Sequence, residues 1–378
     1  MTIRALIVDD SAVFRKIISD TIAALPGLEV VGSAGNGAIA LGRIAALRPD
    51  VVLLDIEMPE MDGFEVLQAI RSQKLDVGVI MVSAFTRRGS DMTIRALELG
   101  AFDFITKATE GTADENRKAI QESLSNVMKA FSRRHEIRAI LKGSEHAAEP
   151  RPAKTGPIEA RTPTTASLRP APDTAIDRME RLAGRSRASL VLIGVSTGGP
   201  NALSQILPRI PADLNAPVFI VQHMPAMFTR SLAESLNARC QIGVKEASHG
   251  EIARPNQIYL APGGRHMKIV PGLNGETAIH ISDDPPENNC RPSVDTLFRS
   301  AALDFPGKAC AVIMTGMGSD GTLGLRLLKR GGCTVIAQDE ASCVVFGMPK
   351  EAIDAGVVDS VVPLERIPAE IVKAVKGY

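Results

Sequence analysis

Short runs of apolar residues alternate with helical patterns along most of the chain. The first half contains four such runs and the second half five: Ala5–Val8, Val51–Leu54, Val77–Val82 and Phe102–Ile105, then Leu190–Ile193, Pro217–Val221, Ile258–Leu260, Ala309–Met314 and Cys333–Ile336. Continuous apolar runs of this length are typical of strands buried on both faces, and their alternation with helices is typical of parallel sheets. The pattern therefore predicts two α/β domains, each with a doubly wound and largely parallel sheet. Active sites in such sheets lie beyond the carboxyl ends of the strands.

A proline-rich segment separates the two halves. Residues 150–172 hold six prolines, and their only large aliphatic side chains are Ile158 and Leu168. Such a segment buries too little apolar surface to offset the entropy of ordering it. We therefore expect a linker here, preceded by a helix. The predicted ranges are a first domain at 1–125, a helix and linker region at 126–187, and a second domain at 188–378. The helix itself is expected near 112–141, and the linker proper at 142–187.

Composition narrows the class of protein. The 378 residues include 43 Lys+Arg and 43 Asp+Glu, and this balance disfavours a general affinity for nucleic acid or for an anionic membrane surface. No apolar stretch is long enough to span a bilayer, and the amino terminus lacks the long apolar region of a signal peptide. The five cysteines show no CxxC spacing, which disfavours both a zinc site and a disulfide framework. We expect a cytoplasmic protein that neither binds nucleic acid nor inserts into a membrane.

Polar side chains follow several strands of the first half. Asp9 and Asp10 end the first run, Asp55 ends another, and Ser83 and Lys107 follow two more. Three carboxylates at one sheet edge repel one another unless a cation neutralises them, and their hard oxygen ligands suit Mg²⁺. Asp55 would then be a nucleophile for phosphoryl transfer, with the ion, Lys107 and Ser83 stabilising the phosphoryl oxygens. The alternative is that one or two of the aspartates only cap the helices that follow.

Residues 1 to about 125 resemble a receiver domain of two-component signalling. The resemblance rests on four segments: Ile7–Ser11, Leu54–Gly63, Val82–Ala84 and Thr106–Lys107. It implies a flavodoxin-like fold and phosphorylation of Asp55 by a cognate histidine kinase. The Mg²⁺ ligands that it implies are Asp9, Asp10, Asp55 and the backbone carbonyl of Glu57. The switch residues that it implies are Ser83, Phe104 at the aromatic position, and Lys107.

A serine set among glycines ends the first apolar run of the second half. In Gly194–Pro200, glycines on both sides of Ser196 allow a sharp turn that exposes the hydroxyl at the carboxyl end of the strand. The hydroxyl needs a base, and His223 follows the next strong apolar run, with His266 in a glycine-rich segment as the reserve candidate. Asp320 follows another strand and glycine turn, where it would orient His223. Taken one at a time, Ser196 also fits a turn hydroxyl, His223 a core histidine and Asp320 a helix cap.

Chain order separates the possible enzyme classes. The order Ser196, His223, Asp320 disfavours an ordinary α/β-hydrolase, in which the acid precedes the histidine. Pro200 and the missing G-x-G-x-x-G spacing disfavour a nicotinamide enzyme. The residues therefore favour acyl transfer by a serine nucleophile on a different α/β fold.

The second half resembles the chemotaxis protein-glutamate methylesterase family, in which a linker joins a receiver to a serine-esterase domain. The matching segments are Gly194–Pro200, Gln222–Pro225, Ala261–Gly263, Arg291–Asp295, Thr315–Gly321 and Ala337–Pro349. The roles implied are Ser196 as nucleophile, His223 as base, Asp320 as its partner, and the backbone N–H groups of Met317 and Thr197 as oxyanion donors. The implied substrates are glutamate γ-methyl esters on the cytoplasmic domains of chemoreceptors, with deamidation of receptor glutamines as a second activity. The family implies a monomer whose esterase reaction needs no cofactor.

Two other functions are weighed against this one. A catalytically silent scaffold that responds to phosphorylation would need no intact catalytic set, whereas all three side chains are present. A DNA-binding output would need a compact basic helix-turn-helix after the linker. The chain from residue 188 onward is instead strand-rich and punctuated by glycine, which disfavours that output.

Overall fold

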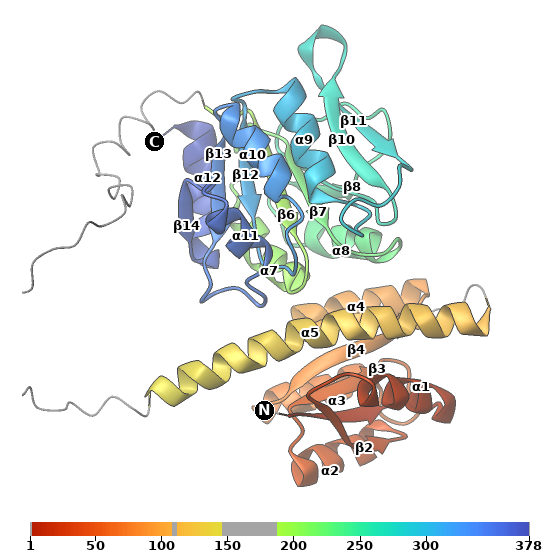
Figure 1. Cartoon of the computed structure of the whole chain (residues 1–378). Helices are drawn as coiled ribbons and strands as arrows, with labels where there is room; N and C mark the ends of the chain where they lie inside the picture. Colours follow the sequence, from red (N-terminus) through yellow and green to blue (C-terminus); the bar gives the residue numbers. More distant parts are fainter. Residues whose placement is uncertain (1, 108–111, 146–186, 378) are drawn as a thin grey trace, which may run out of the picture.

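The structure is a computed structural model that describes residues 2–107, 112–145 and 187–377. They form two α/β domains that lie against each other, with the receiver-like half below and the second half above in Figure 1. The proline-rich part of the predicted linker lies outside the described residues.

The first domain is built on a five-stranded parallel sheet with the order β2-β1-β3-β4-β5. Its strands are β1 (Ile3–Val8), β2 (Leu28–Ala34), β3 (Val51–Asp55), β4 (Gly78–Ala84) and β5 (Asp103–Lys107). Its helices are α1 (Ala12–Ala23), α2 (Gly37–Leu47), α3 (Gly63–Ser72), α4 (Arg87–Glu98) and α5 (Ala113–Glu145). The predicted doubly wound fold is confirmed. Strand β2 has no counterpart among the predicted runs, because this half-buried edge strand interrupts its apolar residues with Glu29, Gly32 and Ser33.

The helix predicted near 112–141 is α5. It buries Leu124, Val127, Met128 and Phe131 against the first domain. It runs across residue 125, the predicted end of that domain, and continues four residues into the segment predicted as linker. Since Val127, Met128 and Phe131 belong to the core cluster of the first domain, this helix is part of that domain beyond residue 125.

The second domain contains a seven-stranded parallel sheet with the order β14-β13-β12-β6-β7-β9-β8. Its strands are β6 (Leu190–Val195), β7 (Val218–Gln222), β8 (Gly243–Glu246), β9 (Gln257–Leu260), β12 (Ala309–Ile313), β13 (Thr334–Gln338) and β14 (Ser360–Val362). The strands β10 (His266–Pro271) and β11 (Thr277–Ser282) form a separate antiparallel hairpin. The helices are α7 (Gly199–Ile206), η1 (Leu207–Arg209), α8 (Phe228–Asn237), η2 (Leu273–Gly275), α9 (Val294–Asp304), α10 (Thr322–Arg330), α11 (Met348–Asp354), η3 (Leu364–Arg366) and α12 (Ile367–Lys376). The predicted α/β class is confirmed for this half as well.

Strand β6 is the topological switch point of this sheet. The chain passes from β6 to β7 on one side, and β12 pairs with β6 on the other. Ser196 lies one residue beyond β6, His223 one residue beyond β7, and Thr315 two residues beyond β12. Because parallel strands end at the same edge, these segments meet in the crevice where α/β sheets bind their ligands.

Candidate active site and phosphoryl-acceptor site

An acidic cluster lies at the carboxyl edge of the first sheet. Asp9 and Asp55 are buried and Asp10 is exposed, and one carboxylate oxygen of each lies within 4.8 Å of the others. Lys107 Nζ lies 2.9 Å from Asp9 Oδ2 and 2.7 Å from Asp55 Oδ2. Burial raises the pKa of Asp55 to about 6 against the opposing effect of Lys107. Two buried carboxylates and one exposed carboxylate this close together fit a hard divalent ion.

The predicted switch residues connect this cluster to the other domain. Ser83 Oγ donates to the carbonyl of Gly89 at 3.2 Å and accepts from Thr93 Oγ1 at 2.8 Å, so it is tied to α4. The ring of Phe104 stacks on that of Phe228 in α8, with centroids 4.6 Å apart. A change at the acidic cluster therefore has a short route to the domain interface. The predicted ligand Glu57 is exposed two residues beyond Asp55, and the role of its carbonyl stays a prediction.

Ser196 is held from three sides at the end of β6. Its N–H donates to the carbonyl of Thr315 at 2.9 Å, and its carbonyl accepts from Gly199 N at 2.7 Å and Gln222 Nε2 at 3.0 Å. A side chain at Gly316 would place its Cβ only 2.7 Å from Ser196 Cβ, so this position requires glycine. The loop after β12 therefore approaches the serine as closely as a backbone allows.

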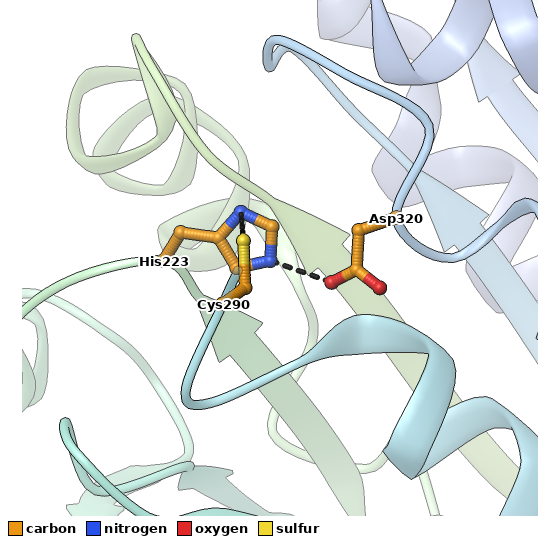
Figure 2. Close-up of side chains that lie close together, drawn as sticks. All are labelled: His223, Cys290 and Asp320. Atoms are coloured by element: carbon orange, nitrogen blue, oxygen red, sulfur yellow. Dashed lines mark hydrogen bonds and ion pairs between the residues drawn. The ribbon is translucent and has the colours of Figure 1, made fainter. Parts of the chain in front are cut away.

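His223 and Asp320 are in direct contact. The N–H of His223 donates to the carbonyl of Val195 at 3.1 Å, which places His223 beside Ser196 at the next strand end. Its Nε2 lies 2.8 Å from Asp320 Oδ2, and its Nδ1 lies 3.6 Å from Cys290 Sγ, as Figure 2 shows. Within the described residues the Ser196 hydroxyl makes no hydrogen bond with His223. The structure thus joins the predicted base and acid and leaves Nδ1 of the base facing a thiol.

Several donors converge on the buried carboxylate of Asp320. Besides His223, they are Asn288 Nδ2 at 2.8 Å, Ser293 Oγ at 2.9 Å, Val294 N at 2.6 Å and Asp295 N at 3.2 Å. Burial alone would raise the pKa of Asp320, but its hydrogen bonds outweigh burial and lower the pKa to about 2. For His223 burial has the opposite effect and would lower the pKa, but the contacts with Asp320 and Cys290 raise it to about 9. The contact with Asp320 therefore stabilises the protonated form of His223.

His266, the reserve candidate for the base, has partners at both ring nitrogens. It is buried at the start of β10, where Nε2 lies 3.1 Å from the carbonyl of Pro285. Its Nδ1 accepts from the N–H of Ser293 at 3.3 Å. Since Ser293 donates to Asp320, this arrangement suits a role in holding the loop around Asp320.

The two predicted oxyanion donors both lie against the receiver. Thr197 Oγ1 donates to Asp103 Oδ2 at 2.8 Å, and burial raises the pKa of Asp103 to about 6 despite that bond. Val345 of the second domain joins the core cluster of the receiver, and Met317 and Val344 pack against this shared cluster. Along the same interface, α4 packs on α7 and α8. The first domain therefore covers the surface immediately beside Ser196.

Sequence reasoning missed three residues that contact this site: Cys290, Asn288 and Asp103. Cys290 and Asn288 precede the Arg291–Asp295 segment, and that proximity was the available signal for both. Asp103 gave no signal, because it only acquires its role when the two domains pack together.

Comparison with known proteins decides the family. Residues 191–371 match the family described as CheB methylesterase, and residues 5–121 match the response regulator receiver domain. The protein-glutamate methylesterase/protein-glutamine glutaminase of Desulfotalea psychrophila is 49% identical and covers 100% of this chain and 99% of its own length. That of Halalkalibacterium halodurans is 43% identical, with 99% of each chain covered. The chain belongs to the protein-glutamate methylesterase/protein-glutamine glutaminase family.

The family assignment confirms the predicted enzyme class, with a receiver domain that regulates a methylesterase domain. The CheB methylesterase catalytic domain of Thermotoga maritima is 43% identical and matches 50% of this chain and 99% of its own length, with a TM-score of 0.48. Among the described residues, no helix is long and apolar enough to cross a membrane.

Proposed function

We propose that Ser196 attacks the γ-carbonyl carbon of methylated glutamates on chemoreceptor cytoplasmic domains, with His223 as base and Asp320 as its partner. The observation that carries this proposal is the 2.8 Å contact between His223 and Asp320, at the strand ends that also position Ser196. Ser196 passes its proton to His223, which returns it to the leaving methoxide. Water then hydrolyses the acyl-serine, releasing glutamate. The same steps on a glutamine side chain release ammonia.

The ring nitrogens of His223 have separate tasks in this mechanism. Asp320 occupies Nε2, so Nδ1 is the nitrogen that accepts the serine proton. Asp320 fixes that tautomer and stabilises the imidazolium, which the raised pKa of His223 reflects. The N–H groups of Met317 and Thr197 would stabilise the oxyanion, because both residues adjoin the close contact between Gly316 and Ser196.

Asp320→Asn should shift the pH dependence of methanol release. His223 acts as a base only when neutral, so kcat/KM of the native enzyme should rise with pH towards the pKa of about 9. Loss of the carboxylate charge lowers the pKa of His223. The rising limb of the kcat/KM profile should therefore move to lower pH, and the maximum value of kcat/KM should fall. Stopped assays of methanol across pH 6–10 would measure both changes. A limb that stays in place would show that Asp320 does not act through His223.

We also propose that Asp55 accepts a phosphoryl group from a cognate histidine kinase in the cytoplasm. Bound Mg²⁺, held by Asp9, Asp10, Asp55 and the carbonyl of Glu57, would supply positive charge at the phosphoryl oxygens. Lys107 Nζ already bridges Asp9 and Asp55 and would neutralise charge on the same group. The close approach of the three carboxylates supports the assignment.

Asp55→Asn should abolish acid-labile phosphorylation, because the substitution removes the nucleophilic oxygen. The measurement is incorporation of radiolabel from a small phosphoryl donor, with and without a chelator. Asp91→Asn is the matched control, since Asp91 is an exposed aspartate on α4. Label that persists in Asp55→Asn, or that forms equally well in chelator, would contradict the assignment.

The domain interface supports a regulatory role for the receiver, and we propose that the enzyme acts as a monomer. Asp103 and the core of the first domain cover Thr197 and Met317, and α4 covers α7 and α8. We infer that this contact restricts access of a receptor helix to Ser196. Phosphorylation of Asp55 would weaken the contact through Ser83 and Phe104, because a modification shifts an equilibrium only by its different effect on the two states.

A further inference from the structure

One cysteine differs from the other four in its surroundings. All five cysteines are free thiols. Burial raises the pKa of three of them, which disfavours the reactive thiolate: Cys240 (to about 11), Cys310 and Cys343. Cys333 is fully buried. Cys290 is half-buried at the active-site edge, and it alone lies beside an imidazole nitrogen.

The loop that carries Cys290 is fixed at both ends. The N–H of Cys290 donates to the carbonyl of Glu287 at 2.8 Å, and the carbonyl of Cys290 accepts from the N–H of Glu287 at 3.1 Å. The Glu287 carboxylate is held to α9 by Arg299 Nη1 at 2.9 Å and Thr296 Oγ1 at 2.9 Å. These bonds position the sulfur beside Nδ1 of His223, and Figure 2 shows this contact.

Cys290, His223 and Asp320 together have the arrangement of an activated nucleophile. The thiol lies 3.6 Å from Nδ1, and the carboxylate lies 2.8 Å from Nε2. A base held by a third group is the arrangement that removes a proton from a neighbouring nucleophile. Nothing in the ester hydrolysis by Ser196 uses this thiol.

We propose that Cys290 is a thiol-modification site at which small disulfides switch off the esterase, an inference that rests on the proposed role of His223 as base. The thiol proton passes to Nδ1 of His223, and the sulfur attacks one sulfur of a low-molecular-weight disulfide. A bond forms between Cys290 Sγ and that sulfur, and the disulfide's own S–S bond breaks. The released thiolate leaves with the electron pair and takes up the proton from His223. A dithiol reductant reverses the exchange.

The adduct would disable the base for a geometric reason. Asp320 occupies Nε2, so Nδ1 is the only ring nitrogen left to accept the proton of Ser196. A group attached to Cys290 Sγ lies against that nitrogen and fills the space in front of it. The nucleophile then has no base, whatever the state of the receiver.

The test uses the full chain, activated by a small phosphoryl donor with Mg²⁺ and incubated with glutathione disulfide. Methanol release from methylated receptor fragments should fall by at least about tenfold, within the contribution that a general base makes. Dithiothreitol should restore it, and peptide mass mapping should place one glutathione on Cys290. The variant Cys290→Ser should release methanol at the same rate with and without glutathione disulfide. Cys343→Ser is the matched control and should be inhibited like the native chain.

Three results would overturn the proposal. They are equal inhibition of Cys290→Ser and the native chain, a glutathione on Cys290 that leaves the rate unchanged, and no adduct on Cys290. A parallel assay of Ser196→Ala separates this proposal from the triad itself. If that variant keeps the native rate, the triad is wrong whatever the thiol results.

Discussion

Ser196→Ala should reduce methanol release from methylated receptor fragments by about 10⁴-fold to 10⁶-fold, the range expected when a serine nucleophile is removed. Only oxyanion stabilisation and substrate binding would remain to assist attack by water. The fold should not change, because the Ser196 hydroxyl makes no hydrogen bond within the described part of the chain and the backbone bonds to Thr315 and Gln222 stay in place. Thermal unfolding should therefore give the native midpoint.

Ser204→Ala provides the matched control for this prediction. Ser204 lies on α7, and its hydroxyl donates only to the carbonyl of Asn201, within its own helix. The same substitution there should leave methanol release near the native rate. Turnover by Ser196→Ala close to that of Ser204→Ala would rule out the serine mechanism. Selective loss of activity in His266→Ala, with His223→Ala still active, would instead move the base to His266.

The positions of the chemical groups could be predicted because each follows a strand of a parallel sheet. Ser196, His223 and Asp320 are far apart in sequence, but strand ends bring their segments to one edge. The same argument placed Asp9 and Asp55 together in the first domain. Strands buried on both faces give continuous apolar runs, so the central strands were visible in the sequence.

The parts that could not be predicted depend on contacts without a local signal. Strands β8 and β14 lie at sheet edges and are short, so their apolar residues form no continuous run. Asn288 reaches Asp320 through a loop with a left-handed backbone at φ 53°, which no periodic pattern describes. Asp103 meets Thr197 across the domain interface, and its sequence neighbourhood only indicates a strand.

Arg239→Glu should raise the basal rate of methanol release by the unphosphorylated chain by on the order of tenfold. The linker holds the two domains at a high effective concentration, so the native contact covers the active site most of the time and its loss has a large effect. In the native chain Arg239 of the second domain forms an ion pair with Glu98 of α4, which also accepts from Ser235 Oγ at 2.8 Å. The substitution places a second carboxylate against the poorly exposed Glu98 and should separate α4 from α8. Receptor helices would then reach Ser196 without phosphorylation.

The charge swap Glu98→Arg with Arg239→Glu is the control that separates occlusion from other effects. It restores an ion pair of opposite polarity at the same place, so the low basal rate and its stimulation by a phosphoryl donor should both return. A chain that begins near residue 186 should match the rate of Arg239→Glu and ignore the donor. If Arg239→Glu and the receiver-free chain were no faster than the unphosphorylated native chain, the interface would not restrict Ser196. Phosphorylation would then act by recruiting the enzyme to its receptors. If the receiver contact does not slow the reaction, loss of that contact cannot accelerate it.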